Sequence, residues 1–142
     1  MNTLECMEPE KKVATGENHL RLPFGLLGFE RVKNYALLTR PHEEPFFWLQ
    51  MLEDAKHAFL IVSPFIAVPD YEPEISQQDV DYLGLTSPAD SLIYNIVTLR
   101  GSGPATINLK GPIVINRHTM IGKQVIPNNA ATFSLHHPLP VS

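Results

Sequence analysis

Prolines constrain the fold of this chain more than any other residue type. Thirteen of the 142 residues are proline, and a proline inside an α-helix removes a hydrogen bond and clashes with the preceding turn. Between the prolines the chain runs in short apolar bursts rich in β-branched residues, which glycine and other turn residues separate. This pattern argues against a helical bundle and predicts an all-β sandwich or barrel.

Nine short segments have the composition of β-strands. The stretch TINLKGPIVINRHTMIGKQVI, at residues 106–126, shows the pattern clearly, because two apolar runs flank Lys110 and Gly111 and a third follows a short loop. The regular spacing and the intervening turn residues are typical of neighbouring strands. The predicted strands are 18–22, 34–39, 45–52, 58–62, 92–100, 105–109, 112–116, 122–126 and 132–136.

A helix is predicted after the fourth of these strands. Ser76 can cap its N-terminus, Asp79 falls in its first turn near the free amides, and Gly84 can end it after about two turns. The segment from Ser87 to Asp90, with sequence SPAD, has the form of a second cap or a tight turn. One or two short helices are therefore expected beside the strands.

Length and charge bound the class of protein. A chain of 142 residues fits one domain, and a hydrophobic share of 44% is enough for a core. We expect the polar residues 1–17 to form a flexible tail and residues 18–142 to form the domain. The net charge of −4 and the pI of about 5.8 argue against direct binding of nucleic acid and suit a basic protein partner.

Cysteine content and hydropathy indicate the compartment. Cys6 is the single cysteine, so an internal disulfide and a cysteine-based zinc site are excluded within one chain. No apolar run reaches the ~18 residues of a membrane span. The N-terminal sequence MNTLECMEPEKK lacks the apolar core of a signal peptide. We therefore expect a cytoplasmic protein that does not bind membranes.

Charged residues are unevenly distributed along the chain. Residues 58–99 contain six acidic residues and no Lys or Arg, whereas residues 100–142 contain four basic residues and no Asp or Glu. The acidic residues are Asp70, Glu72, Glu74, Asp79, Asp81 and Asp90. Two interpretations stay open. The two segments form solvated faces that balance each other in the fold, or the acidic segment is a docking surface for a basic partner.

The sequence lacks the common motifs of catalysis and cofactor binding. There is no P-loop and no GxSxG elbow, and Gly25 and Gly28 suit a turn with positive φ better than a dinucleotide loop. Glu53 and Asp54 suit a charged turn, and the aromatic residues 46–48 suit a core. The histidines show no metal-site spacing; they are His19, His42, His57, His118, His136 and His137. We expect neither enzyme activity nor a cofactor. The alternative is a small-molecule-binding or hydrolytic β-barrel whose site is assembled from scattered His, Glu and Asn side chains.

Seven motifs, taken in order, carry a resemblance to a known family. They are FGLLGFE at 24–30, LQMLED at 49–54, FLIVSP at 59–64, DYE at 70–72, NLKGPIVIN at 108–116, GKQV at 122–125 and HPL at 137–139. With these motifs the sequence resembles the bacterial flagellar assembly factor FliW family over about residues 18–139, and the NLKGPIVIN and GKQV motifs are the most specific. The sequence departs from the family pattern at Met51, Gly111, Phe133 and His136.

The resemblance implies a fold and a function. The implied fold is a compact, mostly antiparallel, β-barrel-like domain. The implied function is that of a cytoplasmic, non-enzymatic protein that binds flagellin. Such a protein also binds and antagonises CsrA, a small dimeric RNA-binding regulator that represses translation. An RNA-binding partner is expected to be basic, and this favours the interpretation of the acidic segment as its docking surface.

Two groups of residues are the predicted protein-binding surfaces. The first follows from charge and comprises Asp70, Glu72, Glu74, Asp79 and Asp81. The second lies toward the C-terminus and comprises Asn116, Lys123, His136, His137 and Leu139.

Overall fold

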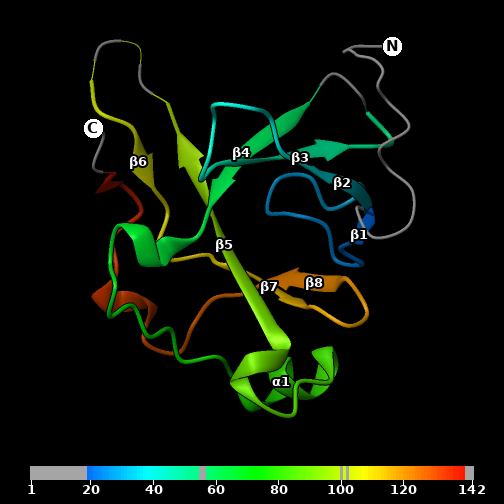
Figure 1. The fold of residues 1–142 in the computed structure, drawn as a ribbon. Helices are drawn as coiled ribbons and strands as arrows, with labels where there is room; N and C mark the ends of the chain where they lie inside the picture. The colour runs from blue at the N-terminus through cyan, green and yellow to red at the C-terminus, as the bar shows by residue number, and fades with distance from the viewer. Residues whose placement is uncertain (1–18, 55–56, 100, 102, 140–142) are drawn as a thin grey trace.

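The computed structural model describes residues 19–54, 57–99, 101 and 103–139, and its centre is a β-barrel (Figure 1). An antiparallel meander of four strands forms the first half of the barrel. These strands are β1 (His19–Arg21), β2 (Asn34–Leu38), β3 (Phe47–Met51) and β4 (Ala58–Val62). Each lies within one of the predicted segments. The predicted tail, residues 1–17, lies outside the described residues.

Three later strands complete the barrel. β4 pairs antiparallel with β5 (Ser91–Thr98), β5 pairs with β7 (Ile113–Asn116), and β7 pairs with β8 (Ile121–Gln124). A parallel contact between Arg21 of β1 and Ile121 of β8 closes the ring. Seven strands of the described chain therefore form a closed, mostly antiparallel barrel, which confirms the all-β prediction.

Aliphatic side chains fill the barrel. Alternate residues of β3 (Leu49 and Met51) and of β7 (Ile113 and Ile115) are fully buried in one cluster, as the pleat of a strand requires. Tyr35 of β2 lies in the same cluster, where burial raises the pKa of its hydroxyl to about 12. The buried polar residues of the described chain lie outside this cluster. Apolar side chains from several strands thus form the core inside the barrel.

A second apolar cluster lies outside the barrel. β6 (Thr106–Ile107) pairs with the end of β5, and β9 (His137–Pro138) pairs with β6. This small sheet covers a cluster that includes Val62, Tyr71 and Leu139. It therefore ties the end of the described chain to the segment that precedes the helix.

The helix α1 (Gln77–Leu83) begins and ends where the sequence predicts. The hydroxyl of Ser76 accepts a hydrogen bond from the amide of Asp79, and Gly84 adopts the left-handed conformation at the C-terminus, with φ of 71°. Leu83 packs on Val114 and Val125 of the barrel wall. The SPAD segment forms a 3-10 helix, η4 (Pro88–Asp90). The predicted short helix is confirmed, and of the two forms predicted for SPAD the structure shows the cap, with Ser87 as the N-cap residue of η4.

One predicted strand, 132–136, is wrong. A 3-10 helix, η5 (Ala130–Thr132), ends at the start of this segment, residues 133–136 form no strand, and β9 starts only at His137. Local bonds replace sheet pairing: the amide of Phe133 donates to the carbonyl of Ala130, and the hydroxyl of Thr132 donates to the carbonyl of Asn129. Threonine often makes such local bonds, which compete with strand pairing.

Candidate protein-binding surface

The predicted acidic residues 70, 72 and 74 lie on one exposed segment between the 3-10 helix η3 (Pro64–Ile66) and α1. We call residues 67–76 the acidic strap (green, lower left in Figure 1). Tyr71 anchors it, because this side chain is 3% exposed and its hydroxyl donates to the carbonyl of Leu109 at 2.7 Å. The ring of Tyr71 also packs on Phe133, with centroids 4.8 Å apart. The strap is therefore attached to the second cluster at its middle.

The backbone of the strap is held by two asparagines in sequence. The Asn129 side chain accepts from the amide of Glu74 at 2.9 Å and donates to the carbonyl of Glu72 at 3.0 Å. The amide of Asn128 donates to the carbonyl of Glu74 at 2.8 Å. Sequence reasoning missed both asparagines, because Asn beside Pro127 has only the pattern of a turn. They fix where the strap carboxylates are presented.

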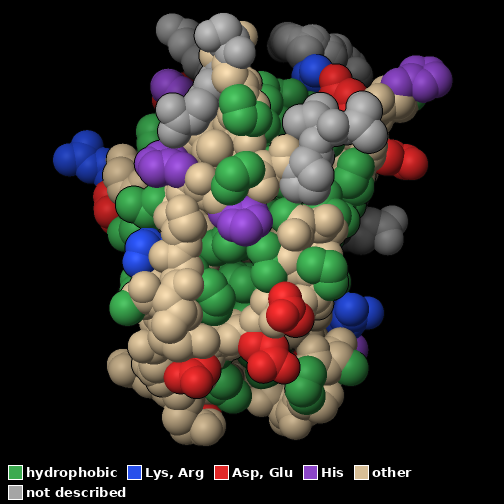
Figure 2. All heavy atoms as spheres, turned by 90° about the vertical axis from the view of Figure 1, so that its left-hand side faces the viewer, with side chains coloured by type: hydrophobic (Ala, Val, Ile, Leu, Met, Phe, Trp, Pro, Cys, Tyr) green, Lys and Arg blue, Asp and Glu red, His purple; other side chains and the backbone are tan. Residues whose placement is uncertain are grey.

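The strap carboxylates are exposed. Asp70, Glu72 and Glu74 point to solvent, and none of them forms an ion pair with another described residue. Figure 2 shows the face of the molecule that lies on the left in Figure 1. In the lower part of this face, acidic side chains lie beside hydrophobic ones, and Lys and Arg lie nearer its margins. Asp81 on α1 is also exposed and accepts from Gln77 at 2.8 Å. The structure thus brings four of the five predicted acids to the surface.

Asp79 is not part of that exposed set, which corrects the surface predicted from charge. Its side chain is 11% exposed and pairs with Lys123, with Oδ1 and Nζ 2.6 Å apart. Lys123 also lies over the rings of Phe24 and Tyr82, at 5.1 and 5.9 Å. A buried carboxylate is stable only with a partner. The pair therefore attaches α1 to β8. Lys123, which was predicted as part of the second binding group, is thus engaged in this ion pair.

Two other residues of the second group lie inside the protein. Asn116 is 5% exposed; its Nδ2 donates to the carbonyl of Leu83, and its Oδ1 accepts from the amides of His118 and Thr119. Leu139 is 3% exposed, in the second cluster. These positions correct the placement of both residues on an accessible surface. The remaining two are His136, which is exposed, and His137, which is half-buried in β9. Any binding role for this group stays a prediction.

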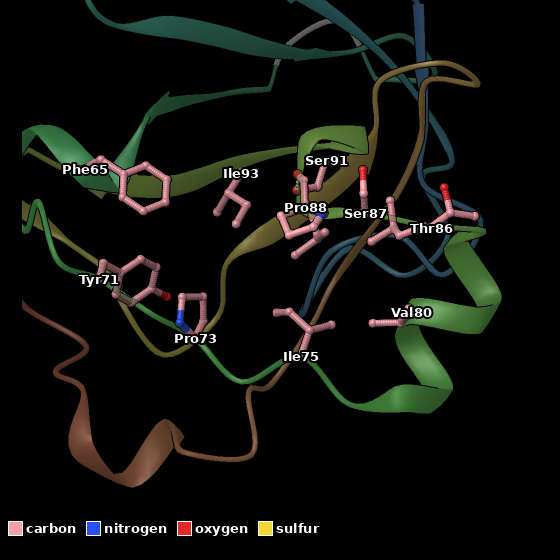
Figure 3. Close-up of a pocket in the computed structure, with 12 residues that line it drawn as sticks. Phe65, Tyr71, Pro73, Ile75, Val80, Thr86, Ser87, Pro88, Ser91 and Ile93 are labelled. Carbon is pink, nitrogen blue, oxygen red and sulfur yellow. Dashed lines mark hydrogen bonds between the residues drawn. The ribbon is translucent and has the colours of Figure 1, made fainter.

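An apolar groove of about 440 Å³ runs between the strap and the barrel wall (Figure 3). Tyr71, Pro73 and Ile75 of the strap lie on one side, and Phe65 and Ile93 lie on the other. The remaining lining residues are Val80, Leu85, Thr86, Ser87, Pro88, Ser91 and Val114. None of these side chains carries a charge at neutral pH. Burial raises the pKa of the Tyr71 hydroxyl above its ordinary value, so Tyr71 is neutral as well.

Asp90 organises the turn at one end of this groove. Its carboxylate accepts from the hydroxyl and amide of Thr86, at 2.7 and 2.9 Å, and from the amide of Ser87 at 3.1 Å. His118 lies 3.0 Å away. These hydrogen bonds, led by that of the Thr86 hydroxyl, hold the pKa of Asp90 well below its usual value. Asp90 thus acts as a cap for η4.

The described residues do not gather the groups that a hydrolytic or metal site needs. Within them, no cluster of three or more His, Cys, Asp or Glu side chains could hold a metal ion. His19 contacts Asn34, His57 contacts Asp54, and the groove contains no histidine. This arrangement gives no support to the alternative of a site assembled from scattered polar residues.

No helix in the described part of the chain is long and apolar enough to cross a bilayer.

Comparison with known proteins decides the family. The family model described as FliW protein matches residues 8–139. The chain belongs to the FliW family. A flagellar assembly factor FliW from Leptospira interrogans is 39% identical over 125 residues, covering 86% of this chain and 83% of the relative. The FliW of Treponema denticola is 37% identical over 121 residues, covering 84% and 82%. A crystal structure of the flagellar assembly factor FliW superposes with a TM-score of 0.79 at 32% identity, over 93% of this chain and 89% of that one.

The most specific FliW-like motifs of this chain have structural roles. Asn108 Oδ1 accepts from the amide of Lys110, and Asn116 attaches α1 to the barrel. Gln124 donates to the carbonyl of Gly111 and accepts from the amide of Leu27. These side chains tie turns to strands and stay mostly covered. The NLKGPIVIN and GKQV motifs thus maintain the barrel, whereas the DYE motif lies in the strap and exposes Asp70 and Glu72.

Of the departures from the FliW pattern, two have a clear structural setting. Met51 is fully buried in the barrel cluster, where an apolar side chain fits. Phe133 packs on Tyr71 and so supports the strap. Gly111 is more constrained, because a Cβ built there would lie 3.0 Å from Nε2 of Gln124. An alanine at this position would require a small shift of Gln124.

Proposed function

We propose that this FliW-family chain acts in flagellar assembly as a cytoplasmic, non-enzymatic binding protein. Its partners are flagellin and a CsrA-type dimeric translational regulator. The observation that carries the proposal is the row of exposed carboxylates at Asp70, Glu72 and Glu74, which form no ion pair within the described ranges, on a firmly held strap. The relatives named flagellar assembly factor FliW support the setting.

Electrostatics gives the strap its role in the antagonism. An RNA-binding regulator holds phosphates with Lys and Arg, so its binding surface is basic. Carboxylates attract such a surface from a distance and speed the encounter. Once bound, the strap places negative charge beside the RNA-binding surface. It then repels an approaching phosphate backbone even where it leaves some RNA contacts uncovered.

Exchange between the two partners makes the system a switch. Abundant flagellin occupies the protein and frees the regulator, which then represses translation of flagellin. Secretion of flagellin releases the protein again and relieves the block. In this scheme the chain itself binds no nucleic acid and no membrane.

The test compares charge removal on the strap with the same change elsewhere. We expect Glu72→Gln with Glu74→Gln to slow association with a purified CsrA-type dimer about 3- to 10-fold at low salt. The difference should shrink as salt screens the charges. Glu30→Gln with Glu44→Gln is the control pair, because it changes net charge equally on other loops. Asp79 is left intact because of its pairing with Lys123.

Stopped-flow or surface-based kinetics at several salt concentrations would supply the rates. Equal association rates for both pairs at low salt would show that only net charge matters and that the strap is an ordinary solvated face. Absence of binding between the unmodified chain and either partner would overturn the proposed function itself.

A further inference from the structure

The groove beside the strap has walls that suit an apolar occupant. Three of its four hydroxyl groups already donate to the protein: Thr86 to Asp90 at 2.7 Å, Ser91 to the carbonyl of Pro88 at 2.8 Å, and Tyr71 to that of Leu109. A polar ligand would therefore find few free donors and no charged partner inside the groove. Exposed apolar surface of this kind is stabilised when another apolar surface covers it.

Apolar and acidic residues alternate along the strap that borders the groove, and we call the two exposed glutamates of the strap, Glu72 and Glu74, its rim. Tyr71, Pro73 and Ile75 line the groove, while the intervening Glu72 and Glu74 are exposed. Neither glutamate forms an ion pair with another residue in the described ranges. An apolar floor and a negative edge thus lie within one short segment. A complementary surface would combine apolar side chains with Lys or Arg beside them.

We propose that the groove and its rim form one docking site for a short amphipathic segment of a partner protein. The apolar side chains of that segment enter the groove, and its flanking Lys or Arg side chains pair with Glu72 and Glu74. This inference rests on the proposed function, since it states the chemistry by which a flagellar partner is recognised. It resembles the general mode in which an amphipathic segment lays its apolar face into a groove.

Phe65 is the residue on which the docking site is best tested. It forms one end of the groove, is 41% exposed, and lies against the ring of Tyr71 with centroids 6.1 Å apart. Apolar contacts at an interface act mainly on dissociation, whereas rim charges act mainly on association. The two parts of the site should therefore separate in kinetics measured on one partner.

The experiment measures association and dissociation of purified flagellin monomer and of a purified CsrA-type dimer. We expect Phe65→Ala to raise the dissociation rate of at least one partner about tenfold, with little change in association or salt dependence. The control is Ile66→Ala, because Ile66 is 45% exposed in the same 3-10 helix and does not line the groove. Val80→Thr, which keeps the side-chain shape but replaces one methyl group with a hydroxyl, should act in the same direction.

Each outcome decides the matter. If the unmodified chain binds a partner and both groove variants dissociate as it does, the groove is not the docking site, while the proposed function stands. An equal effect of Ile66→Ala would assign the contact to the outer face of η3 and overturn the inference. A dimer of the chain alone that Phe65→Ala dissolves would make a second copy the occupant. If Phe65→Ala does not fold, Val80→Thr decides alone. If neither partner binds the unmodified chain, the proposed function fails and the inference with it.

Discussion

Replacing Asn129 with alanine tests how firmly the acidic strap is held. The substitution removes two hydrogen bonds, to the amide of Glu74 and to the carbonyl of Glu72. A hydrogen bond contributes about 0.5–1.5 kcal/mol net, and exposed groups lie at the lower end because water replaces the lost partner. The two bonds together then hold the strap by about 1–2 kcal/mol. Tyr71 and the bond from the Asn128 amide remain.

Hydrogen exchange at the Glu74 amide measures this effect directly. Its hydrogen is bonded to the Asn129 side chain, so a loss of 1–2 kcal/mol should speed its exchange about 5- to 30-fold. The affinity for a strap-binding partner should fall by no more than the same free energy, because binding must then also order the strap. Two-dimensional NMR of the free protein and titration calorimetry of the complex supply the two numbers.

The matched control is Asn128→Ala, since the Asn128 side chain makes no hydrogen bond with another described residue. We expect it to leave the exchange of the Glu74 amide unchanged. Unchanged exchange in Asn129→Ala would refute the assignment of Asn129 as a holder of the strap. Equal acceleration in both variants would place the effect in the 127–130 turn rather than in the side chain.

Two further predictions concern stability. Gly25→Ala should lower the free energy of unfolding by about 2–4 kcal/mol, because φ is +67° and the added Cβ would lie 2.5 Å from the carbonyl oxygen of Phe29. Gly28→Ala is the control, because φ is +90° there but the added Cβ would meet no atom within 4 Å outside the neighbouring residues. It should lower the free energy of unfolding by only about 1 kcal/mol, measured by urea unfolding. Equal losses in the two variants would contradict the steric argument. The lowered pKa of Asp90 stabilises the fold above the ordinary aspartate pKa of about 3.9, and this stability is lost as the pH falls toward the folded value. Asp90→Asn should therefore destabilise more at pH 7 than at about pH 2, and a pH-independent difference would exclude this linkage.

Local signals in the sequence predicted most of the secondary structure. Ser76 and Gly84 mark the ends of α1 because capping depends on residues within one turn of the helix. The strands followed from short apolar runs bounded by turn residues, and errors at their ends were small. The segment 132–136 failed, because Thr132 and Phe133 make bonds within a few residues of themselves and apolar content does not report that.

Long-range pairing explains what the sequence did not predict at the surface. Asp79 and Lys123 are 44 residues apart, and a charge count treats both as free when each neutralises the other. The bond between Asn129 and Glu74 spans 55 residues. The accessible part of the acidic segment, and the groove beside it, exist only because the barrel brings these distant segments together.

The contact between β1 and β8 also determines when, during synthesis, the protein becomes complete. Arg21 and Ile121 are one hundred residues apart, so a chain emerging from the ribosome can pair β1 to β4 long before it can seal the barrel. The strap emerges at an intermediate stage, without Asn129 and without the Val114 wall of the groove. We expect a nascent chain to present its carboxylates early but to grip a partner only after the last barrel strand has left the exit tunnel.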